Sequence, residues 1–245
     1  HRSTYYYQSQ TEPDTILQNS LKNLAAAHPR WGCKKMTATI RNQGFRINHK
    51  KIRRIYREMG LNLRITPKKR FPKRVPVPLV VPNKPNVSWS VDFMSDALVS
   101  GKRFRIFNVI DDFNREALWI GTDTSMPADR VIRILNRVAS IRGFPKQIRS
   151  DNGPEFLSHK IKAWAESMSV EWIFTQPGKP AQNAFIERFN RTFREDILDS
   201  YLFKSLSEVQ AMSFDWMETY NSLRPHESLF NLSPQDYANS MIHAP

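Results

Sequence analysis

Residues 87–124, VSWSVDFMSDALVSGKRFRIFNVIDDFNREALWIGTDT, decide the fold. Three segments rich in β-branched and aromatic residues lie at 87–99, 104–113 and 116–124. Gly101–Lys102 separates the first two segments, and Asn114–Arg115 separates the last two. Short turns between strand-like runs are typical of neighbouring antiparallel strands. The stretch therefore predicts a three-stranded antiparallel meander.

The residues after this meander alternate between helical and strand patterns. Val131, Ile134, Leu135 and Val138 share one helical face, and Gly143 and Pro145 end that helix. The elements predicted are a helix at 128–142, a strand at 146–151, a helix at 158–168, a strand at 170–176 and, after the loop PGKPAQ, a long helix at 182–196. Three antiparallel strands followed by this order predict an α/β fold of the ribonuclease H-like type, a mixed five-stranded sheet with flanking helices.

Positive charge is concentrated ahead of the predicted sheet. Residues 1–84 contain 19 Lys and Arg against 3 Asp and Glu, whereas residues 85–245 contain 18 against 20. Lys and Arg release condensed counterions when they contact phosphates, so a basic segment of this kind indicates nucleic-acid binding. The first third of the chain is therefore expected to bind nucleic acid, and the rest to do something else.

Three short helices are predicted in the basic third, at 14–28, 34–43 and 48–59, with Asn48 as the N-cap of the last. This pattern predicts a small all-α helix-turn-helix module. The candidate recognition helix presents the cations Lys50, Lys51, Arg53, Arg54 and Arg57 opposite an apolar face. A solvated basic helix is the alternative interpretation.

Composition shifts divide the chain into four predicted parts. These are a helix-turn-helix module at 1–63, a basic Pro-rich linker at 64–85, a catalytic core at 86–200 and a helical extension at 201–245 that packs on the core. The linker is expected to follow a phosphate backbone through Lys68, Lys69 and Arg70, or to act as a semi-rigid spacer.

The single cysteine, Cys33, excludes an internal disulfide and a zinc finger of the two-cysteine type. No run approaches the ~18 apolar residues of a membrane span, so no membrane contact is expected.

Three carboxylates are candidates for a common site. Asp92 lies within the first predicted strand, Asp151 at the carboxyl end of the fourth, and Glu187 on the last helix. Asn152–Gly153 permits a left-handed turn that would hold Asp151 at the sheet edge. The alternative is that Asp151 is an ordinary turn residue, because the same short sequence is typical of turns. Glu187 shares a polar stripe with Asn183, Asn190, Arg191 and Arg194, opposite Phe185, Phe189 and Phe193, and a solvated Glu187–Arg191 pair is the alternative. Three carboxylates can hold two divalent cations, the arrangement that phosphoryl transfer commonly uses.

The segments WSVDFMSDA, RSDNGPEF and QPGKPAQNAFIERFNRTFRED resemble the DDE transposases and retroviral integrases. The closer resemblance is to the OrfB-type transposases of the third insertion-sequence family of bacteria. It extends to RSTYYY, RWGCKKMTATIRNQG, VIDDFNREAL and YNSLRPHESL, and so covers nearly the whole chain. Retroviral integrases carry a zinc-binding His/Cys domain, and the lone Cys33 favours the bacterial branch.

The resemblance implies that Asp92, Asp151 and Glu187 are the catalytic, metal-binding residues and that Mg²⁺ or Mn²⁺ is the cofactor, as two ions. It implies a polynucleotidyl transferase that cleaves a phosphodiester at a transposon end and joins the freed 3′-OH to a second phosphodiester. The implied partners are double-stranded transposon ends, target DNA and further copies of the chain, in the bacterial cytoplasm at the nucleoid.

Further residues are assigned by their position around these acids. Lys179, Gln182 and Asn183 are expected to position DNA, and Arg191 and Arg194 to meet phosphate. Asp111 and Asp112 are interpreted as turn or sheet-edge residues, and Asp96 is not counted with the three candidate acids. Glu155 is a candidate for a further metal ligand. His226 is assigned to packing or DNA contact. Two other functions stay open at this point: a ribonuclease H-like nuclease that does not join, and a DNA-binding regulator with an inert α/β domain.

Overall fold

The computed structural model describes residues 14–63, 81–176 and 180–242. The chain divides into two compact units, His1–Lys68 and Lys69–Pro245, called here the helical unit and the sheet unit. Each unit is described by itself.

The described part of the helical unit is a three-helix arrangement, formed by α2 (Thr15–Ala27), α3 (Cys33–Asn42) and α4 (His49–Glu58). The Asn48 side chain caps α4 by accepting a hydrogen bond from the backbone N–H of Lys50 at 2.9 Å. Gly44 after α3 and Gly60 after α4 have φ angles of 93° and 67°, which favour glycine. The buried core of the unit contains Leu17, Leu21, Trp31, Met36, Ile40, Ile52, Ile55 and Tyr56.

The sheet unit contains a five-stranded sheet in the order β3-β2-β1-β4-β5. β1 pairs antiparallel with β2, and β2 pairs antiparallel with β3. On its other side β1 pairs parallel with β4, which pairs parallel with β5. The strands are β1 (Ser88–Ala97), β2 (Arg103–Asp111), β3 (Ala117–Asp123), β4 (Gln147–Ser150) and β5 (Glu171–Phe174). The prediction of a mixed five-stranded ribonuclease H-like sheet is confirmed.

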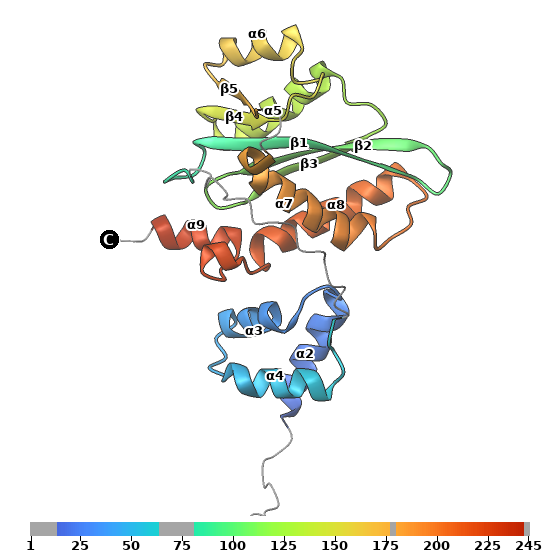
Figure 1. The fold of residues 1–245 in the computed structure, drawn as a ribbon, viewed down its shortest axis with the longest axis vertical. Coiled ribbons are helices and arrows are strands. Elements are labelled where there is room, and N and C mark those ends of the chain that lie inside the picture. The colour runs from blue at the N-terminus through green and yellow to red at the C-terminus, as the bar shows by residue number, and fades with distance from the viewer. Residues whose placement is uncertain (1–13, 64–80, 177–179, 243–245) are drawn as a thin grey trace, which may run out of the picture. The chain divides into compact units, whose positions relative to one another are not determined.

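Helices cover both faces of this sheet (Figure 1). On one face, α5 (Ala128–Arg142) and α6 (His159–Ser167) pack on Trp89, Val91, Phe107 and Val109. On the other face lie α7 (Ala184–Phe193) and α8 (Leu206–Ser222), which pack on Met94, Phe104, Ile106 and Ile110. The alternation of side chains along β1 and β2 therefore supplies both cores.

The helix predicted at 182–196 consists of three pieces. A 3₁₀ turn at Pro180–Asn183 precedes α7, and a π-helical turn at Arg194–Leu198 follows it. The π turn accommodates two buried side chains, Ile197 and Leu198, in the core beneath β1. Side-chain packing thus changes the helical period at the end of α7.

The C-terminal helices complete the sheet unit. Two amide side chains of α8 bind the edge strand β3: Asn221 accepts a hydrogen bond from the Ala117 N–H at 2.8 Å and donates one to the Ala117 carbonyl at 2.9 Å, and Gln210 donates to the Thr122 carbonyl at 3.1 Å. A short 3₁₀ turn (Glu227–Leu229) leads to α9 (Pro234–Ile242). Asn114 donates to the Pro234 carbonyl at 3.1 Å, which ties α9 to the turn after β2.

A buried carboxylate joins three strands of the sheet. Asp112, just after β2, is fully buried and accepts hydrogen bonds from the Ser88 and Ser90 hydroxyls of β1, at 2.7 and 2.6 Å. Its Oδ2 also accepts a hydrogen bond from the Arg149 guanidinium of β4 at 3.1 Å. Asp112 thus lies in the turn after β2, as one of the two predicted placements had it, and its side chain connects β1, β2 and β4 inside the sheet.

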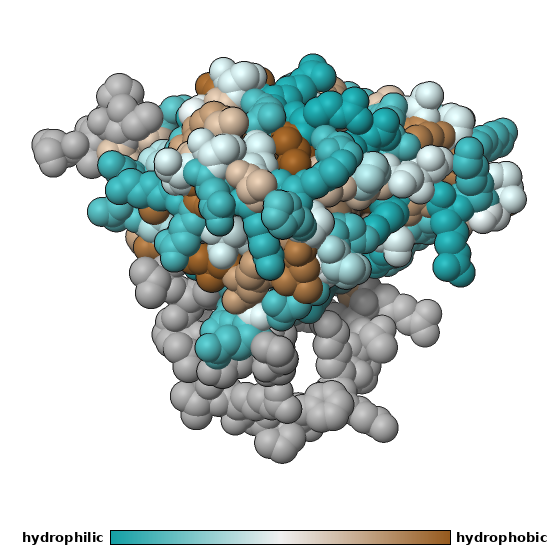
Figure 2. All heavy atoms as spheres, turned by 90° about the horizontal axis from the view of Figure 1, so that it is seen from above, coloured by the Kyte–Doolittle hydropathy of each residue, from teal (hydrophilic) through white to brown (hydrophobic). Residues whose placement is uncertain are grey.

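None of the described helices is long and apolar enough to cross a membrane. The face of the molecule seen in Figure 2 is mainly hydrophilic, with apolar side chains scattered between polar ones. Such scattered apolar side chains are ordinary for a face in contact with water.

Replacing Asp112 should destabilise the sheet unit strongly. Asp112→Ala leaves the buried Arg149 charge and two serine hydroxyls without their acceptor, and breaking a buried pair from one side costs about 3–5 kcal/mol. The free energy of unfolding in urea measures this loss. Asp129→Ala is the matched control, because Asp129 forms an exposed pair with Lys160 and its loss should cost at most about 1 kcal/mol. Equal losses in the free energy of unfolding for the two variants would contradict the role of Asp112 as the buried acceptor that joins the strands.

Candidate functional site

Asp92 lies in the middle of the central strand β1, on the sheet face that carries α7. Its Oδ1 accepts a hydrogen bond from the backbone N–H of Phe93 at 2.8 Å, and its Oδ2 accepts one from the Asn190 side chain of α7 at 2.8 Å. Each carboxylate oxygen therefore has one donor. Since an oxygen has further lone-pair positions, the carboxylate can still bind a cation.

Asp151 is the first residue after β4, which runs parallel to β1. Its exposed carboxylate accepts a hydrogen bond from the Gly153 N–H at 3.0 Å, and Asn152 donates to the Thr175 carbonyl at 2.7 Å. The expected left-handed turn is wrong, because neither Asn152 nor Gly153 has a positive φ. A Cβ at position 153 would lie 3.0 Å from Asp151 Oδ1, a tight contact that the exposed carboxylate would relieve only by shifting.

Glu187 lies exposed in the first turn of α7. The negative charge of Glu187 acts on the carboxyl of Asp92, and so does the negative charge of Asp151. Burial raises the pKa of Asp92 to about 6, and the negative charges of Asp151 and Glu187 also raise it, against the hydrogen bonds from Phe93 and Asn190. The three carboxylates, on β1, after β4 and on α7, are therefore coupled through their charges.

The chemistry of these donors fits hard divalent cations, which take oxygen ligands. A carboxyl whose ionised form is disfavoured by two neighbouring negative charges is a position that a cation would stabilise. Among the described residues, no three His, Cys, Asp or Glu side chains are already gathered in an arrangement that could hold a metal ion. The donors fit the ion, and their arrangement would have to tighten around it.

Asn190 differs from its predicted place on the polar face of the helix. Its side chain is buried, because it lies between two sheet residues. Its Nδ2 donates to Asp92, and its Oδ1 accepts a hydrogen bond from Asn108 Nδ2 of β2 at 2.7 Å. Asn108 is paired directly with Asp92 in the β1–β2 register. Sequence reasoning missed Asn108, although an amide within the apolar run FRIFNVID was a signal for a buried polar contact.

The remaining predicted residues of this region have different surroundings. Gln182 Oε1 accepts a hydrogen bond from the Gln176 N–H at 2.7 Å, and the Asn183 side chain is only 5% exposed. Arg191 is exposed on α7. Arg194 instead contacts β1, where it donates to the Ser95 carbonyl at 2.9 Å and pairs with Asp96 at 3.3 Å. Lys179, Lys68, Lys69 and Arg70 lie outside the described residues.

Glu155 and His226 have contacts of their own. Glu155 forms an ion pair with Arg105 of β2. The His226 ring packs edge-on against Tyr220, with 5.0 Å between ring centroids, and the His226 backbone N–H donates to the Leu232 carbonyl at 3.0 Å. These contacts agree with the packing interpretation of His226.

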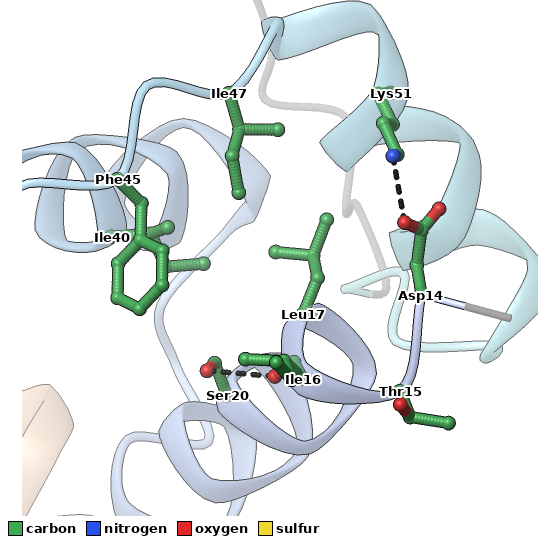
Figure 3. Close-up of a pocket in the computed structure, with 9 residues that line it drawn as sticks. All are labelled: Asp14, Thr15, Ile16, Leu17, Ser20, Ile40, Phe45, Ile47 and Lys51. Carbon is green, nitrogen blue, oxygen red and sulfur yellow. Dashed lines mark hydrogen bonds and ion pairs between the residues drawn. The ribbon is translucent and has the colours of Figure 1, made fainter. Parts of the chain in front are cut away.

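The cations of α4 fall into two groups. Lys51 pairs with Asp14 at 2.6 Å, and Arg54 pairs with Glu58 at 2.9 Å. Lys50, Arg53 and Arg57 are exposed. The Lys51–Asp14 pair stands at the rim of a hollow of ≈ 340 Å³ between α2 and the segment that joins α3 to α4 (Figure 3). Ile16 and Phe45, which are 71% and 41% exposed, line this hollow.

Family models match almost all of the chain. A model described as an HTH-like domain matches residues 12–70, and two models described as integrase core domains match residues 82–180 and 168–234. The chain is 38% identical over 238 residues to the insertion element IS407 uncharacterized 31.7 kDa protein of Burkholderia multivorans, which covers 97% of this chain and 86% of that protein.

Two further similarities agree with these matches. The chain is 24% identical over 255 residues to the putative transposase InsK for insertion sequence element IS150 of Escherichia coli, covering 97% of this chain and 89% of that protein. Among solved structures, a simian T-cell lymphotropic virus intasome chain superposes with a TM-score of 0.53 at 16% identity, covering 92% of this chain and 75% of that chain. This last likeness shows the fold alone.

Asn190→Leu should destabilise the sheet unit by about 1–3 kcal/mol, because it leaves Asn108 and Asp92 without a buried hydrogen-bonding partner. Urea unfolding measures the change. Arg191→Ala, on the exposed face one residue further along α7, serves as the control and should change stability by no more than about 0.5 kcal/mol. If the two variants were equally stable, the contact between α7 and β1 through Asn190 would have no energetic weight.

Proposed function

Because the chain belongs to the OrfB-type transposases of bacterial insertion sequences, which carry integrase core domains, we propose that it cleaves and joins DNA at the ends of its own element. The observation that supports this most directly is that the negative charges of Asp151, after β4, and Glu187, on α7, both act to raise the pKa of Asp92 on β1. Phosphodiester cleavage would free a 3′-OH, which would then attack a second phosphodiester. No covalent link to the protein is needed.

Asp92, Asp151 and Glu187 are the residues that would hold two divalent ions, Mg²⁺ or Mn²⁺. When bound, such ions supply activation of the attacking hydroxyl and stabilisation of the leaving oxygen. The protein's own part is to hold the ligands in place. Phe93 and Asn190 orient Asp92 by donating to its two oxygens, and the Gly153 N–H orients Asp151.

Two surfaces are proposed to meet DNA. In the helical unit, the exposed cations Lys50, Arg53 and Arg57 of α4 would bind the duplex at the terminal repeats. In the sheet unit, Arg191 is exposed one helical turn after Glu187 and would contact a phosphate beside the carboxylates. The predicted DNA contacts of the linker and of Lys179 remain part of this proposal.

Two DNA ends must be held together for joining, so the working form would contain more than one copy of the chain, in the bacterial cytoplasm.

Substituting each of the three acids should abolish both reactions. Asp92→Asn, Asp151→Asn and Glu187→Gln each remove a charged ligand, and the loss should exceed the 10- to 100-fold typical of outer-shell changes around a metal. The assay measures Mg²⁺-dependent cleavage and 3′-OH joining on a duplex that carries the element's terminal inverted repeat. Asp129→Asn, an exposed acid on α5, is the control and should retain wild-type rates.

The same assay separates the alternative functions. A nuclease that does not join would cleave with the wild-type chain but yield no product linked to a second duplex. A DNA-binding regulator would show neither reaction in any variant. Wild-type rates in the three triad variants would overturn the assignment of the acids.

Arg53→Ala and Arg57→Ala should each weaken DNA binding and reduce the slope of log K against log [salt] by about 1, because each removes one phosphate contact. Fluorescence anisotropy with labelled duplex over a range of salt concentrations measures both quantities. Lys22→Ala removes an exposed cation from α2 and is the control, with an unchanged slope expected. An unchanged slope for both arginine variants would indicate a merely solvated helix.

A further inference from the structure

The loop from Asp151 to Leu157, between β4 and α6, is anchored across the sheet on strands β1 and β2. Phe156 is fully buried and stacks on Phe93 of β1, with 4.9 Å between ring centroids and an interplanar angle of 19°. Its ring also packs against that of Phe107 of β2, with 6.2 Å between ring centroids. One end of the loop carries Asp151, so the anchor determines where that carboxylate stands.

A second, polar anchor lies beside the aromatic one. The Arg105 guanidinium of β2 forms an ion pair with Glu155 and lies over the Phe93 ring, 4.3 Å from its centroid. Burial acts to raise the pKa of the Glu155 carboxyl, but the hydrogen bond and charge of Arg105 outweigh it, so the pKa lies below its ordinary value. The Phe93 ring thus supports both anchors, since Phe156 stacks on it as well.

Gly153 connects this ion pair to Asp151. A Cβ at position 153 would lie 3.0 Å from Asp151 Oδ1 and 3.4 Å from Glu155 Oε2, so the two carboxylates flank the same glycine. The Gly153 N–H donates to Asp151, and the Gly153 carbonyl accepts a hydrogen bond from the Phe156 N–H at 3.0 Å. A displacement of Glu155 would therefore be transmitted to Asp151 over a short path.

We propose that Arg105 is a positioning residue for Asp151: through its bond to Glu155 it fixes the loop that presents Asp151, and Glu155 serves this bond without being a metal ligand. The inference rests on the proposed function, because it assigns Asp151 to a cation. Two other roles compete with it. Arg105–Glu155 could be an ordinary partly exposed ion pair with little functional weight, or Glu155 could be a fourth ligand.

Binding of Mn²⁺ to the full chain without DNA tests the proposal, with free Mn²⁺ measured by electron paramagnetic resonance. Arg105→Ala and Glu155→Ala should each weaken Mn²⁺ binding roughly 10- to 100-fold, the range for groups that orient ligands. The double variant should bind no more weakly than either single variant, because both residues act as one unit. Glu155→Gln keeps an acceptor for Arg105 and should bind within about threefold of wild type. Lys160→Ala, which removes another surface ion pair, is the control and should bind like wild type.

Each other outcome overturns the proposal. If Arg105→Ala bound Mn²⁺ like wild type, the pair would have no positioning role, and if Glu155→Gln were as weak as Glu155→Ala, Glu155 would be a ligand. Multiplying effects in the double variant would show two independent roles. Failure of the proposed function looks different: Asp151→Asn would then bind Mn²⁺ as the wild-type chain does.

Discussion

The fully buried carboxylate of Asp112 is the interaction on which the sheet depends most. It accepts hydrogen bonds from β1 and β4 while it follows directly on β2, so three strands converge on one charge. Removing a carboxylate from water is costly, and the cost is offset only when its partners are complete. The parallel pairing of β1 with β4, in which Ser90 lies opposite Arg149, places Asp92 in the middle of β1 beside the carboxyl end of β4, where the Asp151 loop begins. The strands that position Asp92 and Asp151 are therefore the two that this buried charge joins.

Most of the fold could be predicted from local patterns. The β-branched and aromatic runs in residues 87–124 and the turn residues between them predicted β1, β2 and β3, and glycines and caps predicted the ends of the helices. What local patterns could not give were contacts between distant segments. Asn190 was assigned to a polar face because an amide is polar, yet Asn108 and Asp92 satisfy it inside the protein. Gly153 was expected to supply a left-handed backbone, whereas its φ is not positive and a Cβ there would crowd the Asp151 carboxylate instead.

The same limit applies to the charged residues of the site. The three acids could be selected from the sequence by element and motif, and their catalytic role stays a prediction. Their neighbours could not be ranked in this way: Arg191 and Arg194 look alike on a helical wheel, but Arg194 is committed to Ser95 and Asp96 of β1. Glu155 likewise could be given no partner from the sequence, and the structure pairs it with Arg105 of β2. Competition between a substrate and internal partners is decided by tertiary structure, and spacing does not report it.

The hydrogen bonds between the α8 side chains Asn221 and Gln210 and the backbone of β3 have a consequence for assembly. An unprotected edge strand offers a row of backbone donors and acceptors to any extended chain. Here Asn221 holds both backbone groups of Ala117, and Gln210 holds the Thr122 carbonyl near the other end of the strand. A neighbouring molecule could continue the sheet at β3 only by displacing α8 first. Further copies of the chain are thus kept from extending the sheet at this edge, which protects the protein against edge-to-edge aggregation.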